Sequence, residues 1–270
     1  MRKHHLLLLF LSSILIFGCK QTKNKEVHKE VHKEVHKEVH KEVHKEVKKV
    51  NPVSIDKPEK PFVFGIDISH YNNNEVDLLS KSKDSIQFII CKATEGISYI
   101  DPKFKSNWNA IKERGFIRGA YHFYRTQDDP ITQANHFLKA IVNIEKNDIP
   151  PIVDFEEGGI DKLQSTETLE ANLLTFIKII ENKGNVTPII YTSLNCGNRY
   201  LKNPVFNKYP LWIADYNGKE QPDLPKIWLT KNYFIWQKTD DYKIVNGTDD
   251  ADIFNGTLTQ FKTFIKNSYH

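Results

Sequence analysis

The chain has 270 residues, three cysteines and a formal net charge of +4 at pH 7, and 27% of its residues are charged. Residues 1–60 carry 14 Lys/Arg and 8 Asp/Glu, whereas residues 61–270 carry 24 and 26, so the positive charge belongs to the N-terminal part. This balance argues against a basic nucleic-acid-binding domain, and no C-x-x-C or His-Glu-x-x-His pattern indicates zinc, so we expect no nucleic-acid partner, metal or cofactor.

Residues 1–18 have the pattern of a secretory signal peptide. A basic start precedes a mostly apolar run, and Gly18 precedes Cys19. The run is shorter than the about 20 residues that a membrane span needs. Gly18-Cys19 resembles the lipobox of bacterial lipoproteins, which implies lipidation of Cys19, although Phe17 is bulky for that box and leaves an uncleaved anchor or plain secretion as alternatives. We expect a lipoprotein anchored to a membrane of the bacterial cell envelope, either periplasmic or surface-exposed.

Residues 19–60 are expected to form a lipidated tether of low complexity. The tetrapeptide Glu-Val-His-Lys recurs through residues 25–49, and one valine in four residues cannot build a core. The repeated histidines have a spacing that can chelate a metal on a helix, but a spacer explains the same pattern and is favoured: His28, His32, His36, His40 and His44. Pro52, Pro58 and Pro61 then end any helix and introduce the domain at residues 61–270.

Strand and helix signals alternate through this domain. We expect strands at residues 62–68, 86–92, 116–124, 149–155, 187–191, 210–214, 233–237 and near 249–254. We expect helices up to about residue 83 and at 102–114, 130–144 and 166–182, with weaker helical signals after residue 191. Repeated strand–helix units predict a parallel sheet, and eight strands predict closure into a barrel. The fold class is therefore α/β: one irregular, TIM-like (β/α) barrel with fewer helices near its end.

The most informative stretch is 149–159, where two prolines precede an apolar run and two carboxylates follow it. Such a run predicts a short buried strand. Because strand side chains alternate, Ile152, Asp154 and Glu156 should share one face, and Val153 and Phe155 the other. In parallel α/β folds, ligands bind at the carboxyl ends of the strands. For this pair alone, two ordinary surface acids would be the better interpretation.

The other strand ends change that balance, because they also carry acids and aromatic residues. A ring of carboxylates with Tyr and Trp suits a sugar, since acids act on the glycosidic bond and aromatic rings pack on pyranose faces. The candidates are Asp67, Lys92, Tyr121, Asp154, Glu156, Tyr191, Trp212, Trp236 and Asp250. Trp212 and Trp236 fit a core position equally well. We expect Trp108 and His122 to be core residues and Cys91 to be a buried thiol.

This ordered series resembles glycoside hydrolase family 25, the lysozyme-type muramidases of bacteria, phages and fungi. The matching segments run in family order across nearly all of residues 62–266: 65–69, 92–96 with Asp101, 119–123, 154–156, 212–216, 236–237, and Asp250 before 254–256. The resemblance implies an irregular barrel that cleaves the β-1,4 bond between N-acetylmuramic acid and N-acetylglucosamine in peptidoglycan. Peptidoglycan strands are then the expected partner, and we expect a monomer.

The resemblance also implies roles for individual residues. Glu156 corresponds to the general acid, and Asp154 to the residue that stabilises the acetamido group or the cationic intermediate. Asp67 and Asp250 correspond to the other site carboxylates, although the family often has Asn where Asp252 stands, so Asp250 and Asp252 could exchange places. The expected substrate contacts are Lys92, Tyr121, Tyr191 and Trp212, with Lys92 suited to a lactyl or peptide carboxylate.

Two other functions remain open at this point. A catalytically inactive wall-binding barrel would keep the aromatic residues but lose an acid, and all four acids are present. A glycosidase acting on another N-acetylated glycan, such as a chitinase, would also have paired acids, but it usually has a longer Asp-rich run before its acid than residues 151–154 provide.

Overall fold

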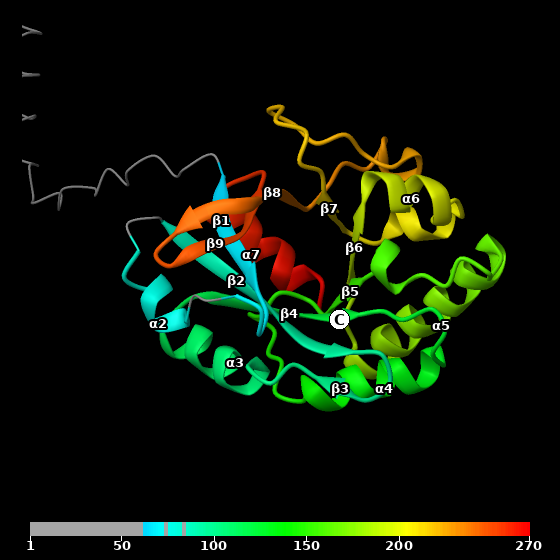
Figure 1. Cartoon of the computed structure of the whole chain (residues 1–270), viewed down its shortest axis with the longest axis horizontal. Coiled ribbons are helices and arrows are strands. Elements are labelled where there is room, and N and C mark those ends of the chain that lie inside the picture. Colours follow the sequence, from blue (N-terminus) through cyan, green and yellow to red (C-terminus); the bar gives the residue numbers. More distant parts are fainter. Residues whose placement is uncertain (1–61, 73–74, 83–84) are drawn as a thin grey trace, which may run out of the picture. The chain divides into compact units, whose positions relative to one another are not determined.

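The computed structural model describes residues 62–72, 75–82 and 85–270. Within these residues, eight strands close into a barrel, and a ninth short strand, β3 (Tyr99–Ile100), pairs with the end of β2. The barrel strands are β1 (Val63–Ile68), β2 (Ile86–Glu95), β4 (Ile117–Phe123), β5 (Ile152–Asp154), β6 (Ile189–Ser193), β7 (Leu211–Ala214), β8 (Ile235–Ile244) and β9 (Gly247–Phe254). The predicted single irregular α/β barrel is therefore confirmed (Figure 1).

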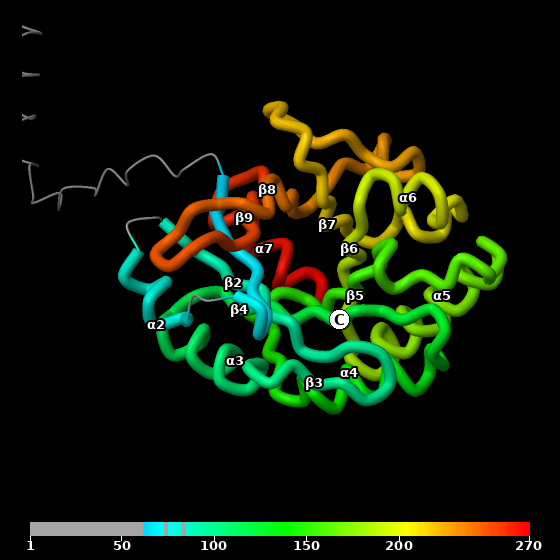
Figure 2. Tube along the Cα trace, viewed as in Figure 1, coloured from blue at the N-terminus to red at the C-terminus, as the bar shows by residue number. Residues whose placement is uncertain are grey.

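The irregularity lies in the last strand. Among the barrel strands, each pair of neighbours from β1 to β8 is parallel, whereas β9 is antiparallel to both β8 and β1 and closes the barrel between them. The connection between β8 and β9 is too short for a crossover helix, so the two strands must form a hairpin. Gly247 begins β9 with a φ of +96°, which suits a glycine in this tight turn. Figure 2 shows the first strand beside this C-terminal hairpin.

Most of the helices cover the outside of the strands, and the last one packs against one end of the barrel. The helices are α2 (Val76–Leu79), α3 (Phe104–Glu113), α4 (Pro130–Ala140), α5 (Thr166–Gly184), α6 (Leu194–Tyr200) and α7 (Leu258–Asn267), with 3-10 turns η1 (Glu157–Gly159), η2 (Pro204–Lys208) and η3 (Lys226–Trp228). After β6 only short helices fit between strands, as predicted. In the described residues, no helix has both the length and the apolar character that a membrane crossing requires.

Two predicted helices are wrong in extent, and one helix was missed. The helix expected before residue 83 has only four residues, Val76–Leu79, and it begins after a turn in which Asn72 Oδ1 accepts a hydrogen bond from the Ser69 backbone at 2.6 Å. The helix expected to reach residue 144 ends at Ala140. The missed helix is α7, which Thr257 and Gln260 begin with a reciprocal capping box.

The alternation of strand side chains produces two apolar layers. Inside the barrel lie residues such as Phe88, Ile90 and Ile152, and between strands and helices lie residues such as Ile89 and Val153. Helix α7 packs into the inner layer at the end where the parallel strands begin, with the Phe261 ring 5.1 Å from that of Phe88. That end of the barrel is thus filled by apolar side chains, and polar side chains are left to the other end.

Candidate active site

The predicted acid pair lies where β5 ends. Ile152 is in the inner layer and Val153 in the outer one, so the alternation predicted for this stretch is confirmed. Asp154 is the last residue of β5, and Glu156 continues the extended backbone (φ −141°, ψ 170°) before the turn η1. A Cβ on Gly159 would lie 2.1 Å from the Tyr124 carbonyl oxygen, so the turn that follows the acids needs a glycine.

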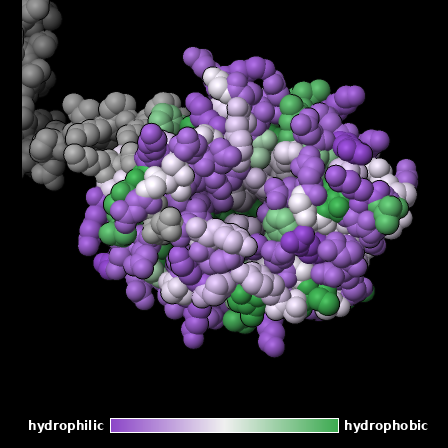
Figure 3. Space-filling model, viewed as in Figure 1, coloured by the Kyte–Doolittle hydropathy of each residue, from purple (hydrophilic) through white to green (hydrophobic). Residues whose placement is uncertain are grey.

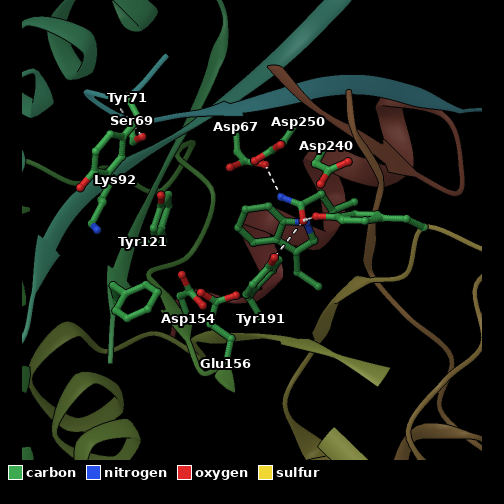
Figure 4. Close-up of a pocket in the computed structure, with 14 residues that line it drawn as sticks. Asp67, Ser69, Tyr71, Lys92, Tyr121, Asp154, Glu156, Tyr191, Asp240 and Asp250 are labelled. Carbon is green, nitrogen blue, oxygen red and sulfur yellow. Dashed lines mark hydrogen bonds between the residues drawn. The ribbon is translucent and has the colours of Figure 1, made fainter. Parts of the chain in front are cut away.

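The acids line a pocket of about 260 Å³ at the carboxyl ends of the parallel strands. All eight side chains predicted for catalysis or substrate contact line it: Asp67, Lys92, Tyr121, Asp154, Glu156, Tyr191, Trp212 and Asp250. Figure 4 shows Asp154 and Glu156 on one side and Asp67, Asp250 and Asp240 on the other. The structure therefore brings together residues from seven strands and the turn after β5.

Six further residues of this pocket were not predicted: Ser69, Tyr71, Phe123, Tyr216, Gln237 and Asp240. Tyr216 and Gln237 belong to the segments 212–216 and 236–237, which resemble the family, so the sequence contained a signal for these two residues. Tyr71 lies in a loop, and Asp240 lies on β8 of the β8–β9 hairpin. Hydrophobic periodicity does not predict that residues in such positions reach a site. Outside the pocket, the face seen in Figure 3 is mostly hydrophilic, with hydrophobic residues scattered over it.

Strand pairing decides which C-terminal aspartate faces the pocket. Asp67 on β1 lies opposite Asp250 on β9, and both line the pocket. Asp252 lies opposite Gly65, is fully buried, and accepts a hydrogen bond from Trp212 Nε1 at 2.8 Å. Burial raises the pKa of Asp67 strongly, and Asp250 and Asp252 raise it further. Burial also raises the pKa of Asp250 to about 6.

Asp154 and Glu156 both have raised pKa values. Burial is the main cause for Asp154, the neighbouring Glu156 adds to it, and Lys92 opposes it. For Glu156, which is half-buried, burial comes first and Glu157 second. Asp154 Oδ1 is buried and has no hydrogen-bond partner in the described residues. The pair therefore favours retention of a proton, and one of its oxygens is available to a donor from a ligand.

A cationic pair supports these acids from β2 and from the loop after β4. Lys92 Nζ donates to Glu95 Oε2 at 2.6 Å, and Arg125 Nε donates to Glu95 Oε1 at 2.9 Å. Arg125 Nη1 also donates to the carbonyl of Gly158 at 2.8 Å, in the turn that follows Glu156. Both cations lower the pKa of Asp154 and of Glu156 and so limit the effect of burial.

Comparison with known proteins agrees with this geometry. The sequence model of "Glycosyl hydrolases family 25" matches residues 66–247. The chain belongs to this family. YegX of Escherichia coli K12, an uncharacterized protein, is 30% identical over 224 residues, which are 81% of this chain and 79% of YegX. The N,O-diacetylmuramidase of Chalaropsis sp. is 30% identical over 195 residues, 67% of this chain and 89% of that enzyme.

The fold agrees as well. The crystal structure of the lysozyme from Streptomyces coelicolor superposes with a TM-score of 0.69 and 26% sequence identity. The superposition covers 76% of this chain and 98% of the lysozyme chain. This family 25 protein is accordingly a glycoside hydrolase. Within the residues that the structure describes, its closed barrel has eight strands.

The remaining aromatic side chains of the family 25 domain divide between site and core. The Trp212 ring lies 4.6 Å from the ring of Tyr191 and 6.4 Å from that of Tyr121, each edge to face, so Trp212 supports the tyrosines from a buried position. Trp236 is in the outer layer and donates to the Asp215 carbonyl. Trp108 is a core residue, as predicted.

His122 and Cys91 are also core residues, which confirms both predictions. His122 is fully buried between Thr94 and Gln133, with hydrogen bonds of 2.7 and 3.1 Å, and burial lowers its pKa to about 3. The Cys91 thiol is fully buried, and burial raises its pKa. The predicted signal peptide (1–18), the tether (19–60), Cys19 and the repeated histidines lie outside the described residues.

Proposed function

We propose that this protein hydrolyses the β-1,4 bond between N-acetylmuramic acid and N-acetylglucosamine in peptidoglycan. The observation that carries the proposal is the pairing of Asp154 with Glu156 at the end of β5, in a pocket that also holds Asp67 and Asp250. Membership of a family whose relatives are named lysozymes and muramidases supports the choice of peptidoglycan. An inactive binding protein would not need four acids converging in one pocket.

Glu156 is assigned as the general acid. Its raised pKa keeps the carboxyl group protonated at a higher pH than that of a free glutamate. In the first step the proton moves to the glycosidic oxygen as the bond from this oxygen to the anomeric carbon breaks. In the second step the ionised Glu156 takes a proton from the attacking water, which restores the acid.

Asp154 is assigned to the acetamido group of the sugar. Its unpartnered Oδ1 can accept a hydrogen bond from the acetamido N–H, while the acetamido oxygen attacks the anomeric carbon and a cationic ring forms. A negative Asp154 stabilises that cation. Burial and the neighbouring carboxylates raise the pKa of both Asp154 and Glu156. A hydrogen bond donated by the substrate lowers the pKa of Asp154, so binding shifts the shared proton to Glu156.

The identity of the bond is tested by product analysis. Purified peptidoglycan is digested, the new reducing ends are reduced with borohydride, and the fragments are identified by mass spectrometry. We expect reduced muramic acid at every new end. New ends of reduced glucosamine would contradict the proposal and indicate a glucosaminidase. Release of sugars from chitin, with none from peptidoglycan, would favour a glycosidase acting on another N-acetylated glycan.

Lys92 should set the pH range of the reaction. Its charge lowers the pKa of both Asp154 and Glu156, so in Lys92→Met both pKa values rise. Activity requires an ionised Asp154 and a protonated Glu156, and therefore both limbs of the pH–rate profile should move to higher pH. The profile of kcat/KM is measured on soluble wall fragments, with Lys112→Met as control because Lys112 pairs with Glu145 on the surface. An unshifted profile would show that Lys92 does not act on the acids.

We also propose that Cys19 is lipidated and that the chain is a membrane-anchored protein of the cell envelope. Support comes from the signal-like start and from the coreless repeat that follows it. Cys19→Ala should move the protein from the membrane fraction to the soluble fraction. The mass of the mature protein, measured in parallel, should lose the lipid. A variant that stays in the membrane fraction with unchanged mass would exclude lipidation at this residue.

A further inference from the structure

Gln237 joins three elements of the pocket and has no role in the mechanism given above. It is the third residue of β8 and is 3% exposed. Its Nε2 donates to Asp67 Oδ2 at 2.6 Å. Its Oε1 accepts from the hydroxyl groups of Tyr191 at 2.8 Å and Tyr216 at 2.5 Å. Figure 4 marks hydrogen bonds between the residues drawn with dashed lines, and these three bonds connect Asp67 of β1 with Tyr191 of β6 and with Tyr216 after β7.

The amide group suits this position for a chemical reason. It donates at one end and accepts at the other at every pH. A carboxyl group of the same shape could do both only while it is protonated, and when ionised it would place a negative charge against Asp67. A methionine of similar size could do neither, so it would leave Asp67 Oδ2 and the two tyrosine hydroxyls without this partner.

The direction of these bonds determines what the pocket offers to a ligand. A phenol has one proton, and Tyr191 and Tyr216 both give theirs to Gln237. Their oxygens can therefore act toward a sugar as acceptors. Burial and the neighbouring Asp250 raise the pKa of Asp67, and the N–H bond from Gln237 opposes that rise and keeps Oδ2 as an acceptor. Together with Asp154 Oδ1, these groups form a set of acceptors that matches the N–H and O–H donors of an N-acetylated sugar.

We propose that Gln237 is a positioning residue for glycan hydrolysis: it fixes the direction of its hydrogen bonds with Asp67 Oδ2, Tyr191 and Tyr216, so that the two tyrosine oxygens face the sugar as acceptors. This proposal rests on the proposed function for the identity of the ligand. The network consists of contacts within the protein, so thermal unfolding tests it without substrate.

The variant Gln237→Glu makes the hydrogen bonding of residue 237 depend on pH. The titratable groups around it come from every neighbouring element: Asp67 on β1, Asp250 and Asp252 on β9, Tyr191 on β6, Tyr216 after β7 and Asp240 on β8 itself. All are acids or phenols, and together with burial they raise the pKa of a glutamate at 237. Below that pKa the protonated Glu reproduces the amide; above it the network is lost.

The experiment compares the full-length wild type, Gln237→Glu, Gln237→Met and the control Gln260→Glu. Gln260 belongs to the capping box of α7, where glutamate is also accepted, so the control makes the same chemical change away from the pocket. For each protein, kcat and KM on soluble peptidoglycan fragments and the midpoint Tm of thermal unfolding are measured from pH 4 to 8. Circular dichroism reports the fold.

We expect kcat/KM of Gln237→Glu to approach the wild-type value at low pH and to fall relative to it by about tenfold per pH unit above the new pKa. Its Tm should match the wild type only below the pKa of an unfolded glutamate, about 4.3, and should fall below it as pH rises from there to the folded-state pKa. The reason is that a folded-state pKa above the unfolded one gives stability that is lost over this range. Gln237→Met should lose roughly 10–100-fold in kcat/KM at every pH. Gln260→Glu should follow the wild type.

A pH-independent difference between Gln237→Glu and the wild type, in both Tm and kcat/KM, would overturn the proposal, and so would a fully active Gln237→Met. The proposed function fails separately, if the wild type releases no muramic acid ends. In that case the Tm profile still decides whether Gln237 holds the network.

Discussion

Glu156→Gln should lower kcat on peptidoglycan by about 10²–10⁴-fold, the range that general acid catalysis contributes. Glutamine keeps the shape of the side chain but has no proton to give to the glycosidic oxygen. Glu156 is half-buried at the start of η1 and makes no cap hydrogen bond there, so we expect the fold to survive the change. Initial rates on soluble wall fragments give kcat, and the thermal unfolding midpoint checks stability.

Glu157→Gln is the matched control for this variant. Glu157 is the next residue, it is exposed, and it accepts a hydrogen bond from Ser193 on the far side of the turn. Because its charge raises the pKa of Glu156, its neutralisation should move the alkaline limb to slightly lower pH and leave kcat at the optimum within a few-fold. A Glu156→Gln enzyme as active as this control would remove Glu156 from the mechanism.

Asp154→Asn should be nearly as severe, with a loss in kcat on the order of 10²–10³-fold. The amide fills the same space, but it carries no charge to stabilise the cationic ring. Because the interaction strengthens in the transition state, kcat should fall much more than KM rises. Steady-state kinetics on fragments of defined length separate the two parameters. A variant that changes KM alone would reduce Asp154 to a substrate-binding residue.

The acid pair could be predicted because its information is local. Two-residue alternation places Ile152, Asp154 and Glu156 on one face, and the turn after them needs the glycine that the sequence provides. The parallel strands, and therefore the position of their carboxyl ends, also follow from local strand–helix alternation. For the same reason, side chains at several strand ends could be assigned to one pocket before their contacts were known.

The rest of the site depends on contacts between distant segments. Gln237 and Asp67 are 170 positions apart, and no local sequence pattern predicts that a glutamine of β8 will form a hydrogen bond with the first strand. Which of Asp250 and Asp252 lines the pocket depends on the register of β9 against β1. Tyr71 is 79% exposed and lies in a loop, and it lines the pocket because the loop backbone passes beside it.

The helices also divide into those that a local sequence pattern predicts and those that it does not. Long amphipathic segments such as α5 were found by their periodicity. The length of α2 was overestimated, since its four residues follow a turn in which the Asn72 side chain bonds to the Ser69 backbone. Helix α7 was missed because it follows an antiparallel hairpin, where strand–helix alternation gives no expectation of a helix. Its function in the fold is to fill the end of the barrel opposite the pocket, through Phe261 and Ile265.

The central claim is that Glu156 protonates the leaving oxygen while Asp154 directs the acetamido oxygen of the substrate to the anomeric carbon. Two displacements at that carbon retain its configuration. The most direct test is NMR of the reducing end within the first minutes of digestion, before mutarotation mixes the anomers. The mechanism predicts that the β anomer of the new muramic acid end forms first and that no covalent sugar–enzyme adduct can be trapped. An initial α anomer would contradict it and assign Asp154 to the activation of water.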